Sequence, residues 1–204
     1  MIIKEAVFLK SAADKSGFMT FDKPMIAVCG KSNVGKSSFI NMLARRNKLA
    51  KTSAAPGRTR LVNYFDFGEF VLADLPGYGF AKVSKAEKAK WGKLMETFFA
   101  DRENIAHVFS LLDIRHRPTE DDRTMISFLN DTRLPCTFIA TKADKLAKTR
   151  VKPRIRELAA EVGTGEGNVI AVSAENARGR DEVLAALDQI CAVAKEVYEE
   201  DEEE

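Results

Sequence analysis

Residues 30–37 read GKSNVGKS and lie between an apolar run, 25–29, and a segment with helical character that begins near Lys36. A strand, a glycine-containing loop and a helix in this order fit the pattern G-x-x-x-x-G-K-[ST], whose backbone N–H groups form a nest for phosphates. Lys36 supplies a charge to the outer phosphates, and the Ser37 hydroxyl is suited to coordinate Mg²⁺. The alternative is a glycine-rich turn without a ligand. The strand-to-helix context favours a nucleotide-binding domain.

Strand and helix patterns alternate along the chain, which predicts an α/β fold with a mostly parallel sheet. We expect a three-layer P-loop NTPase fold with six strands. Gly68 and Glu69 form a two-residue hairpin signal that makes one edge of the sheet antiparallel. Ser84 with Glu87 is a capping box that starts a helix. The six strands are expected at 25–29, 61–67, 70–74, 105–114, 135–140 and 168–172, and an edge strand near 6–10 is also compatible with the sequence.

Length and composition fit one globular domain, since 204 residues with 45% apolar side chains are enough for a sizeable core. We expect an N-terminal extension (1–24) packed on the domain, the nucleotide-binding domain itself (25–198), and a disordered acidic tail (199–204). No apolar stretch is long enough to span a membrane or to form a signal peptide, which indicates a cytoplasmic protein. Widely spaced and odd in number, the cysteines are expected to be reduced core thiols: Cys29, Cys136 and Cys191.

The formal charge of +2 hides an asymmetry, because residues 199–204 contribute six acids and no base. Without them the chain has 32 bases and 24 acids, a balance that suits a polyanionic partner. The acidic run itself is explained by solubility, with a regulatory contact as the alternative.

The tetrapeptide TKAD at 141–144 indicates which base is bound. It follows a strand, as a base-reading loop at the carboxyl edge of a parallel sheet should. Asp144 offers two oxygens to guanine N1–H and the exocyclic amine, whereas adenine has no such pair of donors. Lys142 can lay its stem along the base, and the backbone after the last strand can donate to guanine O6. Guanine is therefore favoured, although TKAD alone is also compatible with a surface turn.

Two further segments complete the phosphate chemistry. Asp74 in DLPG, at 74–77, is placed to hold Mg²⁺ through water, and the Gly77 N–H can bond the γ-phosphate. Thr59 in PGRT, at 56–59, is the natural second hydroxyl ligand of Mg²⁺ when GTP is bound. Loops that order with GTP and relax with GDP form a switch. PGRT alone is also compatible with a simple turn.

The nucleotide site is thus assigned to five segments of the chain. We expect catalytic roles for Asn33, Lys36, Thr59 and Gly77, and metal ligation by Ser37, Thr59 and Asp74. The full set of binding residues is Gly30, Lys31, Ser32, Asn33, Val34, Gly35, Lys36, Ser37 and Ser38, then Gly57, Arg58 and Thr59, then Asp74, Leu75, Pro76 and Gly77, then Thr141, Lys142, Ala143 and Asp144, and last Val172, Ser173 and Ala174.

With these motifs the chain resembles the TRAFAC class of GTPases and, within it, the EngB (YsxC/YihA) family over about residues 5–195. The resemblance rests on GKSNVGKSS, TSAAPGRTRLVNYF, DLPGYGFAKV, KWGKL, DIRHRPTE and TKADKL. It implies GTP and GDP binding with Mg²⁺, weak GTP hydrolysis, a role in assembly of the large ribosomal subunit, and a requirement for normal cell division and septation.

Two positions depart from the commonest GTPase pattern. Thr141 stands where many GTPases have Asn, although Thr is usual in the resembled family. Tyr78 stands where Ras-like enzymes place the water-orienting Gln, so hydrolysis by the isolated protein should be slow. In related GTPases an Asn at the position of Asn33 helps to hold K⁺ beside the phosphates, where a cation can replace an arginine finger. The alternative is that Asn33 only shapes the loop.

Two groups of basic residues are candidates for an rRNA surface. One is spread over residues 45–60 and the other follows a strand, and we expect both near the nucleotide face. RNA binding there would weaken with salt through counterion release. The alternative is that some of these bases cap helices or contact the nucleotide. The residues are Arg45, Arg46, Lys48, Lys51, Arg58 and Arg60 in the first group, and Arg115, His116 and Arg117 in the second.

The expected partner is therefore a precursor of the large ribosomal subunit or its rRNA, with no membrane and no DNA, and the protein is expected to be a monomer. Two other functions compete with this one. A signalling GTPase would be expected to carry a lipidation signal, yet the chain ends in EEDEEE and Ile2 follows Met1. A binding module that uses GTP only as a structural ligand fits the same motifs.

Overall fold

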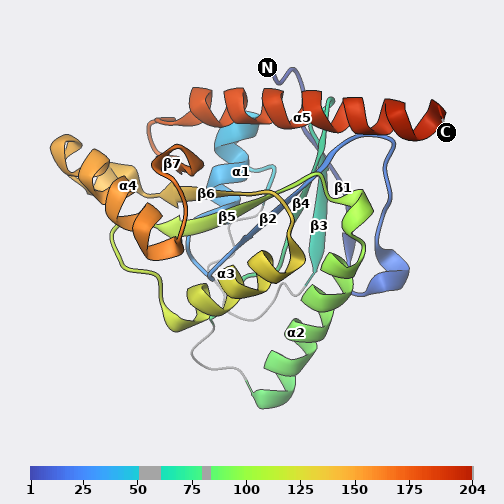
Figure 1. Ribbon diagram of the computed structural model, residues 1–204, viewed down its shortest axis with the longest axis horizontal. Coiled ribbons are helices and arrows are strands. Elements are labelled where there is room, and N and C mark those ends of the chain that lie inside the picture. The colour runs from blue at the N-terminus through green and yellow to red at the C-terminus, as the bar shows by residue number, and fades with distance from the viewer. Residues whose placement is uncertain (51–60, 80–83, 204) are drawn as a thin grey trace.

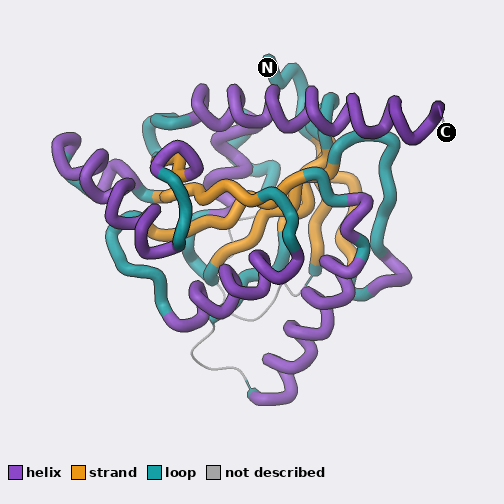
Figure 2. Tube along the Cα trace, viewed as in Figure 1, coloured by secondary structure: helices purple, strands orange, loops and turns teal. Residues whose placement is uncertain are grey.

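A single β-sheet forms the middle layer of the protein, with helices on both of its faces (Figures 1 and 2). The computed structural model describes residues 1–50, 61–79 and 84–203. The sheet has seven strands in the order β1-β3-β4-β2-β5-β6-β7. Their bounds are β1 Val7–Ala12, β2 Met25–Gly30, β3 Val62–Asp66, β4 Val71–Asp74, β5 His107–Asp113, β6 Cys136–Thr141 and β7 Val169–Ala171.

In the described part of the chain, four α-helices connect strands and a fifth follows the last strand: α1 Lys36–Ala44, α2 Lys85–Ala100, α3 Glu120–Thr132, α4 Lys148–Val162 and α5 Arg180–Glu203. Short 3-10 turns lie at Lys15–Gly17, Arg102–Asn104, Ala143–Lys145 and Glu166–Asn168. The predicted capping box is present, since the Ser84 side chain accepts from the N–H of Glu87 and the Glu87 carboxylate accepts from the N–H of Ser84. Strands and helices alternate along the chain, which confirms the predicted α/β fold.

The strand count was wrong by one, because β1 adds a seventh strand to the six that we expected. It pairs antiparallel with β3, which also pairs antiparallel with β4, so two antiparallel pairs lie at this edge. β2, β4, β5, β6 and β7 pair in parallel. Most of β1 is exposed on both faces, so its sequence lacks the alternation of apolar and polar residues that identifies a half-buried strand.

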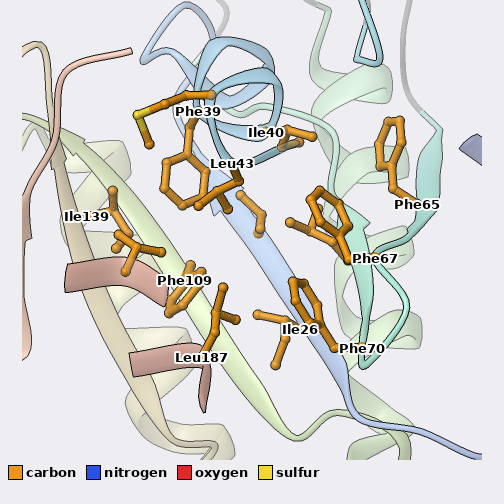
Figure 3. Close-up of a cluster of buried hydrophobic side chains, with 14 of the residues drawn as sticks. Ile26, Phe39, Ile40, Leu43, Phe65, Phe67, Phe70, Phe109, Ile139 and Leu187 are labelled. Carbon is orange, nitrogen blue, oxygen red and sulfur yellow. The ribbon is translucent and has the colours of Figure 1, made fainter. Parts of the chain in front are cut away.

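The two faces of the sheet carry different parts of the core. On one face α1 and α5 pack against the strands through Phe39, Ile40 and Leu43 of α1 and Leu187 of α5 (Figure 3). On the other face α2 and α3 pack through a second apolar cluster, and α3 and α4 through a third. Each α-helix follows a strand of the parallel part of the sheet along the chain, so the connecting loops gather at its carboxyl edge, where such sheets bind ligands.

Helix α5 continues further than the sequence suggested. Its bounds are Arg180–Glu203, so the structure describes helix in a segment, 199–204, that we predicted to be disordered. Adding residues to an existing helix needs no new nucleus, which explains how a run of acids can continue it. Within 1–50, 61–79 and 84–203, no helix combines the length and the apolar character needed to cross a membrane.

Candidate nucleotide-binding site

The phosphate loop joins the end of β2 to the start of α1, as its sequence predicts. Gly35 precedes α1 with φ 111° and ψ 21°, a left-handed conformation that glycine adopts without steric cost. Val34 is buried and fixes the middle of the loop against the core, while Asn33 is exposed with φ 63°. The N–H groups at the start of α1 have no partner within the helix, which suits them to an anion.

The segment after β4 lies directly beside this loop. The N–H of Ser32 donates to the carbonyl of Tyr78 at 2.8 Å, and Lys31 and Tyr78 form a parallel bridge. A Cβ on Gly77 would lie 3.1 Å from the Nζ of Lys36 and 3.1 Å from the N of Ser32, so a larger residue would press on the loop. Both phosphate-binding segments that the sequence predicts are therefore side by side.

Asp74 ends β4 and is buried, with a relative exposure of 9%. Its Oδ1 has no hydrogen-bond partner among the described residues. Burial raises the pKa of this carboxyl, and the charge of Lys36 and a hydrogen bond from Asn63 offset the effect only in part. A buried carboxylate oxygen without a partner is what a nearby cation or its water shell would satisfy. The Asp74 carboxylate therefore fits a role as a ligand of Mg²⁺ or of its water shell.

Such an ion would take most of its ligands from outside the protein. Among the residues that the structure describes, no three or more His, Cys, Asp or Glu side chains form a group able to hold a metal. Ser37, at the start of α1, and Asp74 are oxygen donors on the two adjacent segments. Mg²⁺ is commonly held by one or two protein ligands together with phosphates and water, so this ion would enter with the nucleotide.

The base-reading loop is hydrogen-bonded to the phosphate loop. The hydroxyl of Thr141, at the end of β6, lies 2.7 Å from the carbonyl of Val34 and 3.1 Å from that of Leu112, and it is buried. The Nζ of Lys142 donates to the carbonyl of Asn33 at 2.9 Å. Thr141 thus holds the two loops together, a role for which a hydroxyl is sufficient although many GTPases have Asn here.

Asp144 and the segment after β7 are also joined. The Ser173 hydroxyl donates to Oδ1 of Asp144 at 2.7 Å, and the N–H of Ala143 donates to the carbonyl of Val172 at 3.0 Å. The hydrogen bond from Ser173 and then the Lys145 ammonium, 3.0 Å from Oδ2, lower the pKa of Asp144. The carboxylate is therefore an ionised acceptor, as recognition of the two guanine donors requires.

Asp113, at the end of β5, was not among the predicted site residues. Its Oδ2 lies 3.0 Å from the Nζ of Lys142, and Arg115 binds both of its oxygens, at 2.9 and 2.7 Å. Burial raises the pKa of Asp113, but the hydrogen bonds from Arg115 and Lys142 outweigh it and hold this pKa well below its usual range. Asp113 thus orients Lys142. Its position in DIRHRPTE, directly at a strand end, was the available signal.

Tyr78 also has a role that the sequence did not reveal. Its hydroxyl donates to Oδ1 of Asp122 at 2.9 Å, and Oδ2 of Asp122 accepts from the N–H of Thr119 in a capping box at the start of α3. Its ring packs edge to face with Trp91, whose indole N–H donates to the carbonyl of Pro76 at 3.0 Å. The side chain at the position of the Ras-like Gln is therefore buried and bonded to α3.

Several predicted residues cannot be placed in this site. Gly57, Arg58 and Thr59 lie outside the described residues, as do Lys51 and Arg60 of the first basic group. Three further bases of that group follow the C-terminal end of α1, whereas the phosphate loop lies at its N-terminal end, about 14 Å away. The expectation that they face the nucleotide is therefore wrong for Arg45, Arg46 and Lys48. The Nη1 of Arg46 instead donates to the carbonyl of Ala6.

The remaining residues predicted to bind the nucleotide come together at the carboxyl edge of the sheet, from the ends of β2, β4, β6 and β7. This fold with these four segments defines a P-loop GTPase domain. Residues 25–142 match the family model described as a 50S ribosome-binding GTPase.

Comparison of the whole sequence with known proteins identifies the family within this class. A probable GTP-binding protein EngB from Desulfosudis oleivorans is 41% identical over 197 residues, covering 96% of this chain and 100% of the relative. The chain belongs to the EngB family of GTP-binding proteins. A crystal structure of a probable GTP-binding protein engB has the same fold, with a TM-score of 0.71, 21% identity, and coverage of 82% of this chain and 98% of that one.

A more distant structure also shares the fold. It is Era in complex with MgGDPNP and nucleotides 1506–1542 of 16S ribosomal RNA. The TM-score is 0.62 with 21% identity, and the match covers 83% of this chain and 56% of Era.

Proposed function

We propose that this protein is a slow, Mg²⁺-dependent GTPase that acts as a nucleotide switch in assembly of the large ribosomal subunit. One observation carries the nucleotide part of this proposal: Thr141 and Lys142 bond to the carbonyls of Val34 and Asn33. These contacts fix the distance between a phosphate loop and a base-reading loop. A fixed distance between the two ends of one ligand is what recognition of a whole guanine nucleotide requires.

In the proposed reaction the chain acts by holding the substrate. Lys36 and the N–H groups at the start of α1 bind the β- and γ-phosphates, and the Gly77 N–H bonds the γ-phosphate. Ser37 and Asp74 would hold Mg²⁺, and this ion would supply positive charge beside the phosphate oxygens. Because Asp74 is buried, bulk water does not compete with the ion for its carboxylate.

The slow rate follows from Tyr78. Its hydroxyl is engaged by Asp122 and its ring by Trp91, so it does not orient an attacking water. An outside group must then supply the missing stabilisation, and we propose K⁺, the ribosome, or both. Asn33 is the candidate K⁺ ligand, although its left-handed backbone, which Asn tolerates well, is also explained by loop shape alone. Equal GTPase rates in KCl and NaCl at matched ionic strength would exclude K⁺.

The ribosomal part of the proposal is supported by the description of the matching family model and by the basic body of the chain. We also propose that the protein is needed for normal cell division and septation, because a defect in ribosome assembly would impair both. We further propose that the protein works in the cytoplasm as a monomer.

The deciding experiment is a pull-down from cell extract with the protein loaded with GDP or with a non-hydrolysable GTP analogue. Enrichment of large-subunit precursors in only one nucleotide state is the expected result. Equal recovery in both states, or none, contradicts a switch that acts on the ribosome. Multiple-turnover phosphate release in the presence of large subunits separates an enzyme from a module that uses GTP only as a structural ligand, because the latter releases none.

A further inference from the structure

The N-terminal half of α2, residues 85–93, lies at the surface of the domain. None of its residues is buried, and the first buried side chain of α2 is Leu94. Figure 1 shows this end of α2 projecting from the body of the domain, while its C-terminal half packs under the sheet. A projecting helix that buries so little needs a reason other than the core.

Its composition is strongly basic. The segment contains four lysines, and its single acid, Glu87, belongs to the capping box. Lys88 lies 3.7 Å from a carboxylate oxygen of Asp121, a contact that is largely exposed. Within 1–50, 61–79 and 84–203, the other three lysines, Lys85, Lys90 and Lys93, have no carboxylate at ion-pair distance. Their charge is therefore not neutralised by the part of the domain that the structure describes.

The helix presents these charges outward. At about 100° per residue, Lys85, Lys90 and Lys93 fall within an arc of about 140°, and Trp91 lies on the opposite side of the helix. Trp91 is the inward contact, since its indole N–H bonds to Pro76 and its ring packs on Tyr78. The other exposed side chains of the segment include Ala86 and Ala89, so it has no large apolar anchor of the kind that dominates protein–protein interfaces.

We propose that the lysine face of α2, defined by Lys85, Lys90 and Lys93, is an RNA-binding surface that contacts backbone phosphates. The source of the RNA, a precursor of the large subunit, rests on the proposed function. Phosphates are the polyanion that lysines without apolar neighbours fit best. Trp91 bonds directly to the carbonyl of Pro76, next to Gly77, so a shift of this segment on binding of a γ-phosphate would be passed to α2. Nucleotide control of the RNA surface through α2 is part of the proposal.

The test compares two triple charge reversals of equal size. The first carries Lys85→Glu, Lys90→Glu and Lys93→Glu. The control carries Lys148→Glu, Arg150→Glu and Lys152→Glu on α4, whose side chains are also exposed and which lies across the domain from α2 (Figure 1). Circular dichroism and GDP binding establish that both fold. The probes are a labelled RNA hairpin, titrated over a range of salt, and purified large ribosomal subunits.

For the α2 variant we expect hairpin affinity to fall about tenfold or more. The slope of log K against log salt is negative, and for this variant it should become less steep by about 2 to 3. Each phosphate that the protein no longer neutralises reduces the size of the slope by about 0.7 to 0.9. The α4 control should change affinity by less than about twofold. Equal decreases in both variants, or no decrease in either, overturn the proposal. If the α2 variant loses binding to the subunits but still binds the hairpin like the wild type, the proposal is also overturned, and an acidic protein partner is favoured.

Failure of the two proposals can be told apart. If the wild-type protein binds the hairpin through α2 but associates with large subunits in neither nucleotide state, the RNA surface stands and the ribosomal role fails. If the wild type associates with subunits in one nucleotide state and the α2 variant does so equally well, the ribosomal role stands and the RNA surface on α2 is wrong.

Discussion

The hydroxyl of Thr141 provides the sharpest test of how this site is built. Thr141 is 4% exposed, and its hydroxyl lies 2.7 Å from the carbonyl of Val34 in the phosphate loop and 3.1 Å from that of Leu112 in β5. A hydroxyl has one proton, so it serves these two carbonyls together as a shared donor. Thr141→Val keeps the shape of the side chain and removes only this donor.

The expected cost follows from the burial. Leaving a buried acceptor without its partner costs about 1 to 3 kcal/mol, and we expect the unfolding free energy in urea to fall by that amount. Because Val34 is part of the phosphate loop, about 1 kcal/mol of this cost should also appear in nucleotide binding, a decrease of about fivefold in GDP affinity. Titration with a fluorescent GDP analogue measures it.

Two substitutions serve as controls. Thr141→Ser removes the methyl group and keeps the donor, so it should bind GDP like the wild type. Thr141→Asn introduces the residue that many GTPases have here and should also keep a donor for the Val34 carbonyl. If Thr141→Val binds GDP as tightly as the wild type, or if the Ser and Val variants weaken binding equally, the hydroxyl does not hold the two loops together and the reasoning is refuted.

Four further results are expected. Asp144→Asn should weaken guanine-nucleotide binding by a few kcal/mol, measured by calorimetry, because an amide cannot accept from both guanine donors; unchanged affinity would place the base elsewhere. Asp74→Asn should stabilise the nucleotide-free protein near pH 7, because burial raises the pKa of Asp74, with a gain in urea midpoint that shrinks as the pH falls toward the ordinary pKa; Mg²⁺ should then no longer tighten nucleotide binding. Burial lowers the pKa of His107 from 6.5 to about 4, so between these pH values the unfolded chain protonates this imidazole and the folded chain does not. The unfolding free energy should therefore fall as the pH drops from 6.5 to about 4, and His107→Gln should flatten this part of the stability–pH profile. Trp91 is the only tryptophan and bonds to Pro76, so its emission should differ between the GDP and GTP-analogue states, and identical spectra would count against coupling of α2 to the switch.

The sequence predicted those parts of the site that depend on local order along the chain. The phosphate loop, DLPG, TKAD and the segment at 172–174 each follow a strand, so a parallel sheet brings them to one edge without any knowledge of side-chain contacts. The capping box of Ser84 and Glu87 was predictable for the same reason, because its two members are three residues apart.

Contacts between distant residues could not be predicted in this way. Asp113 meets Lys142 only because β5 and β6 are neighbours in the sheet, with Asp113 opposite Thr141. Tyr78 was recognised as the replacement for a catalytic Gln, but its bond to Asp122 depends on how α3 packs. The position of Arg45, Arg46 and Lys48 does have a local signal in the sequence, because the nine residues of α1 start at the phosphate loop and lead away from it.

Strand β1 has a practical consequence for anyone who shortens this protein. It occupies the outer side of β3 through antiparallel pairing from Val7–Asp66 to Ala12–Val62. Removal of residues 1–12 to obtain a minimal nucleotide-binding domain would leave the N–H and C=O groups of β3 open to strands from other molecules. Such a shortened protein should self-associate during purification, and its solubility would reflect a missing neighbour and not a damaged nucleotide site.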